Sequence, residues 1–459
     1  MGSSVVDEAG HVLRLRGVGL GGWLNMENFI TGFPGNEEGW RDALRRELGE
    51  DRYTFLFERF LEYFFADEDA AYVRSLGLNL VRIPINYRHF ESDADPLVVR
   101  DEGFRHLDRA IEVCARHELY TVIDLHAVQG YQNPDWHCDN PTHRALLWQH
   151  RHFQDRAAHL WEVIADRYRG NRWVAGYNLI NEPEDRTHGA LIPVTRRLYD
   201  AVRAVDPDHL VFVDGNHFAS DFSDFTEAWP GVVYSAHDYA LCGFPGGGPY
   251  PGYTGSVWCD RAWLERHYLR KSAFMREHGA PVWIGEFGPV YSGDRELDAT
   301  RYDLAADQIA LYDRYGAHWA LWTYKDIGLQ GLVYAAPDSP YVRRIAGVLT
   351  KKSRFGVDSW GGTDAELSGI LEAVTTVLTG ELSPGDELPW DPIWQSRRLL
   401  RSILFAEALV PEAAACFRDL DEAAIDTLMR SFAFENCMRR ESLASLLAAA
   451  SEKLIPTGA

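Results

Sequence analysis

Two glutamates follow short apolar segments and have the chemistry that glycosidic bond cleavage requires. Glu182 stands in Asn181-Glu182-Pro183 after residues 174–180, and Glu286 stands in Ile284-Gly285-Glu286-Phe287-Gly288. In a glycoside hydrolase, one carboxylic acid protonates the leaving oxygen while a second carboxylate attacks or supports the anomeric carbon. These two carboxyl groups are therefore the leading catalytic candidates.

Other polar and aromatic residues stand at equivalent positions after further apolar segments. They are Arg82, Asp124, His126, His237, Asp238, Tyr239, Trp322, Lys325 and Asp326. Buried charge is costly unless it is paired or used, so this recurrence favours an active site over ordinary core packing. The simpler alternatives are an ion pair between Arg82 and Asp124, structural roles for the two histidines, and a core position for Trp322.

Eight apolar segments alternate with amphipathic stretches and predict the elements that position these residues. The expected strands are residues 15–20, 80–85, 120–126, 174–180, 210–213, 232–236, 282–285 and 319–323. Strands that are apolar throughout are buried on both faces, as in a parallel sheet covered by helices. We expect an α/β fold, a (β/α)8 TIM barrel, in which the carboxyl ends of the strands carry the active site.

The barrel is expected to occupy residues 1–350, and a C-terminal extension residues 351–459. An N-terminal hairpin around Ala9-Gly10 is expected to plug the barrel bottom, and residues 35–65 form a long helical insertion after the first strand. The sequence pattern predicts an all-helical extension, in which one helix begins at Asp391-Pro392. We expect it to pack as a satellite bundle that covers the side of the barrel. The alternative is that a helix or loop of the extension, such as residues 434–439, narrows the mouth or forms an oligomer contact.

Several motifs together resemble glycoside hydrolase family five. They are residues 16–24 (RGVGLGGWL), 77–84 (GLNLVRIP), 124–127 (DLHA), Asn181-Glu182-Pro183, the Gly-Glu-Phe-Gly at 285–288 and Trp322. The similarity covers about residues 11 to 350. It implies a retaining mechanism with Glu182 as acid/base and Glu286 as nucleophile.

The resemblance also implies roles for the surrounding side chains. Asn181 would donate to the sugar 2-hydroxyl, and Arg82 and Tyr239 would keep the nucleophile ionised. His126 and His237 would line the subsite before the cleaved bond, with Trp322 as its aromatic floor. A negative charge on Glu286 is expected to raise the pKa of Glu182 and keep it protonated.

Additional sugar contacts are predicted in the loops after three strands. They are Trp136, His137, Asp139 and Asn140 after the third strand, Trp23, Asn25 and Glu27 after the first, and Lys325 and Asp326 after the eighth. A solvated loop is the alternative for the first two groups. The Gly- and Pro-rich residues 243–255 are expected to form an irregular rim.

Composition restricts the possible partners. The 459 residues are 46% hydrophobic and 25% charged, and 46 Lys and Arg against 68 Asp and Glu give a formal net charge of −22. Such an acidic surface repels nucleic acid and anionic lipid but not a neutral carbohydrate substrate. Neither partner is therefore expected, and the oligomeric state stays open.

No cofactor or metal is expected. No G-x-G-x-x-G opens a helix after the first strand, and no C-x-x-C or H-E-x-x-H motif occurs. No secretory signal is visible, which favours the cytoplasm and free thiols for the six cysteines; a bridge from Cys138 to Cys242 or Cys259 is the alternative.

The favoured function is a retaining O-glycoside hydrolase acting through a covalent glycosyl–Glu286 intermediate, and exo-acting on a small glycoside or oligosaccharide. The first alternative is an endo-acting β-glycanase of the cellulase or mannanase type. Two others are a metal-dependent barrel hydrolase with Asp124, His126, Glu182 and His237 as ligands, and a non-catalytic carbohydrate-binding protein.

Overall fold

The structure is a computed structural model that describes residues 4–358, 360–363, 365–381 and 392–452. Its centre is a closed barrel of eight parallel strands in the order β11-β12-β3-β4-β5-β6-β7-β8. The strands are β3 (Arg16–Gly19), β4 (Leu80–Asn86), β5 (Tyr120–Ala127), β6 (Val174–Asn178), β7 (Leu210–Asp214), β8 (Val232–His237), β11 (Val282–Phe287) and β12 (His318–Leu321). All eight predicted strands are confirmed, with boundaries that differ by a few residues.

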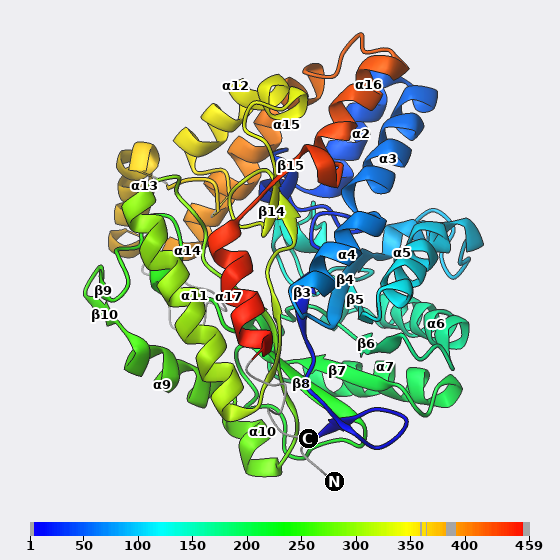
Figure 1. Ribbon diagram of the computed structural model, residues 1–459. Helices are drawn as coiled ribbons and strands as arrows, with labels where there is room; N and C mark the ends of the chain where they lie inside the picture. Colours follow the sequence, from blue (N-terminus) through cyan, green and yellow to red (C-terminus); the bar gives the residue numbers. More distant parts are fainter. Residues whose placement is uncertain (1–3, 359, 364, 382–391, 453–459) are drawn as a thin grey trace.

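Helices surround the barrel and cover the outer face of its strands (Figure 1). They are α4 (Asp67–Ser75), α5 (Arg105–Arg116), α6 (Arg151–Tyr168), α7 (Leu191–Val205), α9 (Arg261–Lys271), α10 (Ala273–His278) and α11 (Arg295–Tyr315). The short α8 (Asn216–Ala219) directly follows β7, and α12 (Pro340–Phe355) packs instead against helices of the C-terminal segment. Because helices bury one strand face and the barrel interior buries the other, the strands are apolar along their whole length. The predicted (β/α)8 barrel is confirmed.

A short hairpin lies beneath the barrel, as the sequence predicts. Strand β1 (Val5–Val6) pairs antiparallel with β2 (Val12–Leu13). Val5 is buried in the interior cluster that also contains Phe212 and Trp283. This apolar contact seals the end of the barrel opposite the active site.

The chain after β3 forms an insertion of three helices. They are α1 (Asn28–Thr31), α2 (Glu37–Leu48) and α3 (Glu50–Phe64). Two helices from the C-terminal segment, α15 (Ala406–Ala415) and α16 (Glu422–Met429), pack on α2 and α3 respectively (Figure 1). Aromatic rings join the two regions, as in the edge contact of Trp40 with Phe417, whose centroids lie 5.7 Å apart.

The remaining C-terminal elements extend over the side and the mouth of the barrel. They are α13 (Ser368–Gly380), α14 (Pro392–Arg398), a π-helix (Leu399–Phe405) and α17 (Glu441–Glu452), which packs on α11. The predicted cap Asp391 lies outside the described residues.

The expectation of an all-helical extension is wrong at one place. Strand β15 (Cys437–Arg439) pairs antiparallel with β14 (Val333–Ala335), which pairs with β13 (Lys325–Asp326). The three residues of β15 are too few for a periodic pattern in the sequence, and they adopt extended structure because β14 offers an open edge. Residues 434–439 thus fasten the extension to the barrel instead of narrowing its mouth.

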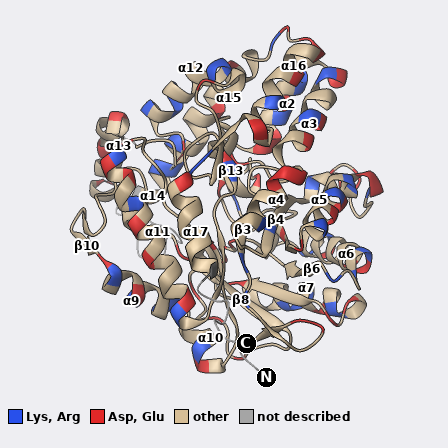
Figure 2. Ribbon diagram, viewed as in Figure 1, with Lys and Arg blue, Asp and Glu red and all other residues tan. Residues whose placement is uncertain are grey.

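The charged residues are distributed over the outer helices, where acidic and basic side chains intermingle (Figure 2). In the described part of the chain no helix combines the length and the apolar character needed to cross a membrane. The six cysteines are free thiols, and neither alternative bridge to Cys138 is formed.

Candidate active site

Glu286 lies at the carboxyl end of β11 between two hydrogen-bond donors. Arg82, which is fully buried on β4, donates through Nη1 to Glu286 Oε1 at 2.6 Å. The hydroxyl of Tyr239, which follows β8, donates to Glu286 Oε2 at 2.8 Å. Both carboxylate oxygens are therefore engaged, and the adjacent guanidinium stabilises their negative charge.

Arg82 also positions the residue that precedes Glu182. Its Nη2 donates to Asn181 Oδ1 at 2.7 Å and lies 3.0 Å from Asp124 Oδ2. Asn181 Oδ1 is thereby occupied, so its amide nitrogen, 3.3 Å from His126 Nε2, faces the site. Arg82 forms the ion pair with Asp124 and also contacts the candidate nucleophile. The structural and the catalytic interpretation of Arg82 are therefore compatible.

Glu182 lies beyond β6 in a strained backbone conformation. Its φ of 46° is in the left-handed region, and its N–H donates to Asp214 Oδ2 at 3.0 Å. Such a conformation costs about 1–3 kcal/mol in a residue other than glycine and persists only where surrounding contacts enforce it. Here it turns the Glu182 side chain toward Glu286.

Two imidazoles flank the Glu182 carboxylate. His237 Nδ1 lies 2.6 Å from Oε1, and His137 Nε2 lies 3.1 Å from Oε2. Burial alone would raise the pKa of Glu182, but these two histidines hold it well below its usual range. The expectation that Glu286 raises the pKa of Glu182 is therefore wrong for the free protein, because the closer imidazoles outweigh the second carboxylate.

A buried layer supports the two carboxylates from below. His126 Nδ1 lies 2.8 Å from Asp124 Oδ2, and the His126 ring stacks parallel on Trp322 at a centroid distance of 5.5 Å and an angle of 2°. Burial raises the pKa of Asp124 to about 6. A Cβ atom at Gly19, the last residue of β3, would lie 2.6 Å from the Trp322 ring, so a glycine is required here for this close approach.

Glu27, at the entrance of α1, adds a third carboxyl group. It is 4% exposed, and its Oε1 has no hydrogen-bond partner within the protein while lying 3.5 Å from His126 Nε2. Burial, followed by the charges of Glu286 and Glu182, raises its pKa well above the usual range. The raised pKa favours the protonated form of Glu27, which can donate one hydrogen bond and accept others.

A pocket of about 500 Å³ opens above Glu182. Its barrel lining comes from the segments after β5, β6, β7 and β8, including Trp136, His137 and Phe218. The C-terminal segment supplies the rest of the lining: Trp360, Trp394, Arg397, Arg398, Arg401 and Ser402. A contribution of the extension to the mouth was expected only as an alternative, and none of these residues was predicted, because they lie outside any motif; the one signal was the content of 15 tryptophans.

Trp360 lies across one side of the mouth. Its ring stacks on Phe29 at 4.8 Å and makes edge contacts with Trp136 and Tyr239, both at 6.0 Å. Its indole N–H donates to Gln330 Oε1 at 2.7 Å. Trp360 itself lines the pocket, so its indole ring forms part of the wall on the side of Phe29.

Two predicted sugar contacts lie elsewhere. Lys325 is fully buried with Nζ 2.7 Å from Asp69 Oδ1 and 2.8 Å from the carbonyl oxygen of Phe432. The Asp139 carboxylate is also buried and accepts hydrogen bonds from Asn36, Asn86, Arg88 and the Glu38 N–H. Both predictions are wrong because the loops after the strands turn these side chains into the protein.

The structure does not bring the four side chains of the alternative metal site together. The described residues contain two clusters with possible metal-ligand geometry, and neither is the predicted set of Asp124, His126, Glu182 and His237. Asp124 is instead paired with Arg82 and His126.

An eight-stranded parallel barrel with two opposed glutamates, one following β6 and one at the carboxyl end of β11, defines a glycosidase. A sequence profile described as "Cellulase (glycosyl hydrolase family 5)" matches residues 59–328. The chain belongs to glycosyl hydrolase family 5, and it is a retaining glycoside hydrolase acting on O-glycosyl bonds of a carbohydrate substrate.

The relatives of this chain are named for different activities. The chain is 46% identical to a beta-xylosidase of Phanerodontia chrysosporium, over 97% of this chain and 96% of that protein. It is 21% identical to Endoglucanase C of Acetivibrio thermocellus, over 66% and 95%. Its fold resembles endoglucanase Cel5A from Thermotoga maritima, with a TM-score of 0.50 and 19% identity over 69% and 91%.

Proposed function

We propose that this family 5 enzyme is an exo-acting β-glycosidase that removes a terminal sugar from small β-xylosides. This proposal rests on the position of Trp360, which lines the pocket and contacts Phe29 and Tyr239. We propose that the Trp360 ring closes this side of the mouth. A glycan chain cannot continue through a closed side, whereas an endo-acting enzyme needs a groove open at both ends. The xyloside preference is supported by the beta-xylosidase that aligns over nearly the whole chain.

In the proposed reaction, Glu286 is the nucleophile and Glu182 the acid/base. Protonated Glu182 donates its proton to the glycosidic oxygen while a Glu286 oxygen bonds to the anomeric carbon and the leaving alcohol departs. In the second step Glu182 takes a proton from water, the water oxygen bonds to the anomeric carbon, and the Glu286 ester breaks. Retention follows from two displacements at one carbon.

The histidines beside Glu182 store the proton for the first step. His237 and His137 both have a raised pKa, because burial is outweighed by their contacts with the carboxylates of Glu182 and Glu286. We propose that the proton moves across the 2.6 Å contact between His237 and Glu182 as the leaving oxygen approaches. Substrate binding displaces water and favours the neutral carboxylic acid over the ion pair.

Glu27, His126 and Trp322 are proposed to hold the terminal sugar. The unpartnered Glu27 oxygen and the Asn181 amide nitrogen both lie close to His126 Nε2, at 3.5 and 3.3 Å. Sugar hydroxyls can satisfy these buried polar groups, and the Trp322 face suits the C–H face of a sugar ring.

The test uses nitrophenyl β-xyloside together with xylo-oligosaccharides labelled at the reducing end. We expect xylose as the first product from every chain length, and NMR should show the β-anomer forming first. Nitrophenyl β-glucoside and α-arabinofuranoside are the comparison substrates. Early release of xylobiose or longer products would contradict exo action, and first formation of the α-anomer would contradict the two-step route.

A further inference from the structure

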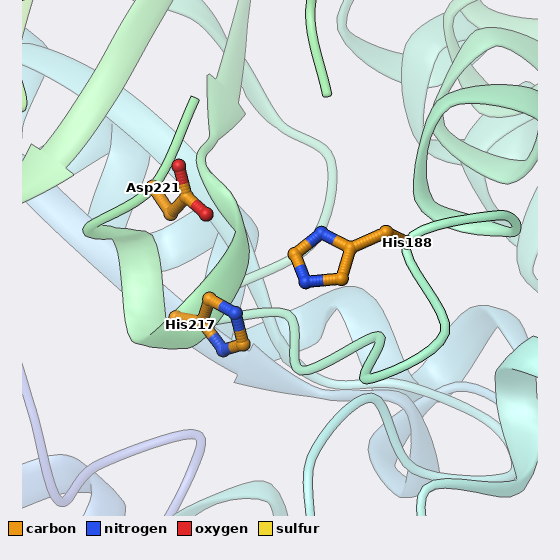
Figure 3. A group of neighbouring side chains, drawn as sticks. All are labelled: His188, His217 and Asp221. Carbon is orange, nitrogen blue, oxygen red and sulfur yellow. The ribbon is translucent and has the colours of Figure 1, made fainter. Parts of the chain in front are cut away.

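A second group of polar side chains lies beside the active-site pocket. It consists of His188, in the segment between β6 and α7, and His217 and Asp221, which follow β7. One donor atom of each residue lies within 4.8 Å of the others, and Figure 3 shows the side chains converging on a common space. Imidazole and carboxylate are the ligands that zinc and related divalent ions use.

The two histidines are oriented as metal ligands are. His188 Nδ1 lies 3.0 and 3.1 Å from the two oxygens of Asp224, and His217 Nδ1 lies 3.2 Å from Glu184 Oε2. A carboxylate on Nδ1 places the proton there and leaves the Nε2 lone pair available. The second nitrogen of each ring points toward the other histidine (Figure 3).

The surrounding backbone holds this arrangement in place. Asn216 and Asp221 exchange two backbone hydrogen bonds, of 2.7 and 3.0 Å. The Asn216 side chain also binds Asp224 Oδ2 at 3.1 Å and is fully buried. His217 has a left-handed φ of 49°, an uncommon conformation that directs its ring toward His188. The backbone that carries His217 and Asp221 is thus held in place by these hydrogen bonds.

The electrostatic balance favours a cation. Asp221, Glu184 and Asp224 bring three carboxylates to the cluster, and Arg186 pairs with Glu184 at 3.1 Å. With both imidazoles neutral, three acceptor groups converge and repel one another unless a cation lies between them. A surface cavity of about 560 Å³, lined in part by His217 and Asp221, gives water access to the cluster.

We propose that His188, His217 and Asp221 bind one divalent transition-metal ion of the zinc type, with water completing the coordination. Ligand atoms on a tetrahedral zinc ion lie about 3.4 Å apart, so the half-exposed rings must move inward slightly. The ion joins the segment after Glu182 to the loop whose His217 also lines the active-site pocket. The proposed ion would therefore cross-link two segments beside the active-site pocket.

The test is a Zn²⁺ titration of the full-length enzyme, prepared without an oligohistidine tag, in competition with a chromophoric chelator. We expect one bound ion per chain, and loss of this binding in His188→Ala and Asp221→Ala. Asp224→Asn keeps all three ligands but removes a carboxylate from His188, so it should weaken binding about tenfold. His152→Ala, at an exposed helical histidine, is the matched control and should bind as the wild type does.

Co²⁺ provides a second readout. Four- or five-coordinate Co²⁺ absorbs visible light strongly, so the wild type should develop this band at one equivalent and His188→Ala should not. Circular dichroism confirms that each variant is folded. Equal Zn²⁺ affinity in wild type and folded His188→Ala would overturn the proposal, as would binding without one-to-one saturation.

Discussion

One carboxylate oxygen of Glu182 lies within 4.8 Å of one oxygen of Glu286, and His237 Nδ1 stands between them at 2.6 and 3.5 Å. Retaining glycosidases place their carboxyl groups about 5–5.5 Å apart, whereas inverting enzymes need about 6.5–9.5 Å to admit a water. The observed proximity fits direct attack by one carboxylate on the sugar.

Substitution of each glutamate should have a different result. Glu286→Gln removes the proposed nucleophile, and we expect kcat/KM on nitrophenyl β-xyloside to fall at least about 10⁴-fold. Glu182→Ala should lose about 10²–10⁴-fold on substrates with poor leaving groups. Added azide should partly restore Glu182→Ala and yield a β-xylosyl azide. Unchanged turnover in either variant would remove that residue from the mechanism.

Trp360→Ala should alter chain-length selectivity. Opening the closed side of the mouth is expected to lower kcat/KM for nitrophenyl β-xyloside about tenfold, equivalent to about 1.4 kcal/mol, and to add xylobiose to the early products. Trp258→Ala, at a tryptophan 47% exposed on β10 (Val257–Cys259), is the control. A Trp360→Ala product pattern identical to wild type would argue against its role in exo action.

Glu27 should tolerate loss of its ionisable group. Because burial raises the pKa of Glu27 and favours its protonated form, Glu27→Gln preserves size and hydrogen-bonding capacity and should change kcat/KM by about twofold at most. Glu27→Ala should lower it about tenfold. Steady-state kinetics at pH 7 separates the two. Equal losses in Gln and Ala would mean that the charged form is required.

Lys325→Met should destabilise the fold without affecting substrate binding. It leaves Asp69 buried without its cation, and breaking such a pair typically costs about 3–5 kcal/mol. Urea denaturation should show this loss, and KM should stay unchanged because Lys325 faces Phe432 instead of the pocket. Lys325→Met/Asp69→Asn should recover part of the stability. A raised KM with normal stability would mean that Lys325 contacts the substrate after all.

His318 should make the protein sensitive to acid. It is 1% exposed, accepts the Leu15 N–H at Nδ1, and burial lowers its pKa to about 3. The unfolded chain, with a histidine pKa near 6.5, binds a proton that the folded chain does not. Above pH 6.5 His318 therefore does not lower the free energy of unfolding. Below that pH it lowers the free energy of unfolding by about 1.4 kcal/mol per pH unit as the pH drops toward 3.

The variant His318→Asn tests this pH dependence. Its side-chain oxygen can replace Nδ1 as the acceptor but does not titrate, so the variant should lose less stability on acidification. Urea denaturation at pH 7, 6, 5 and 4 measures the difference. Parallel pH dependence in both proteins would contradict the assignment.

The barrel and the glutamate pair were predictable because their signals are local. Each strand is a short apolar run, and Glu182 and Glu286 directly follow two of them. The fate of Asp139 and Lys325 was not predictable, because the direction of a loop side chain depends on distant partners such as Asn36 and Phe432. The low pKa of Glu182 likewise depends on His137, which only the folded loop brings near.

Trp360 illustrates the remaining difficulty. It follows the barrel in the sequence, shares no motif with it, and still reaches Phe29 and Tyr239 at the mouth. Such long-range contacts leave no periodic signal in the residues around them.

The packing of α15 and α16 on α2 and α3 joins segments separated by more than 300 residues along the chain. During translation, the aromatic surface of α2 and α3 therefore cannot be covered until the last tenth of the polypeptide has left the ribosome. A nascent chain that ends soon after β12 would expose this surface and recruit chaperones, even though every barrel strand has been synthesised. The enzyme thus becomes mature only when its carboxyl-terminal helices have docked.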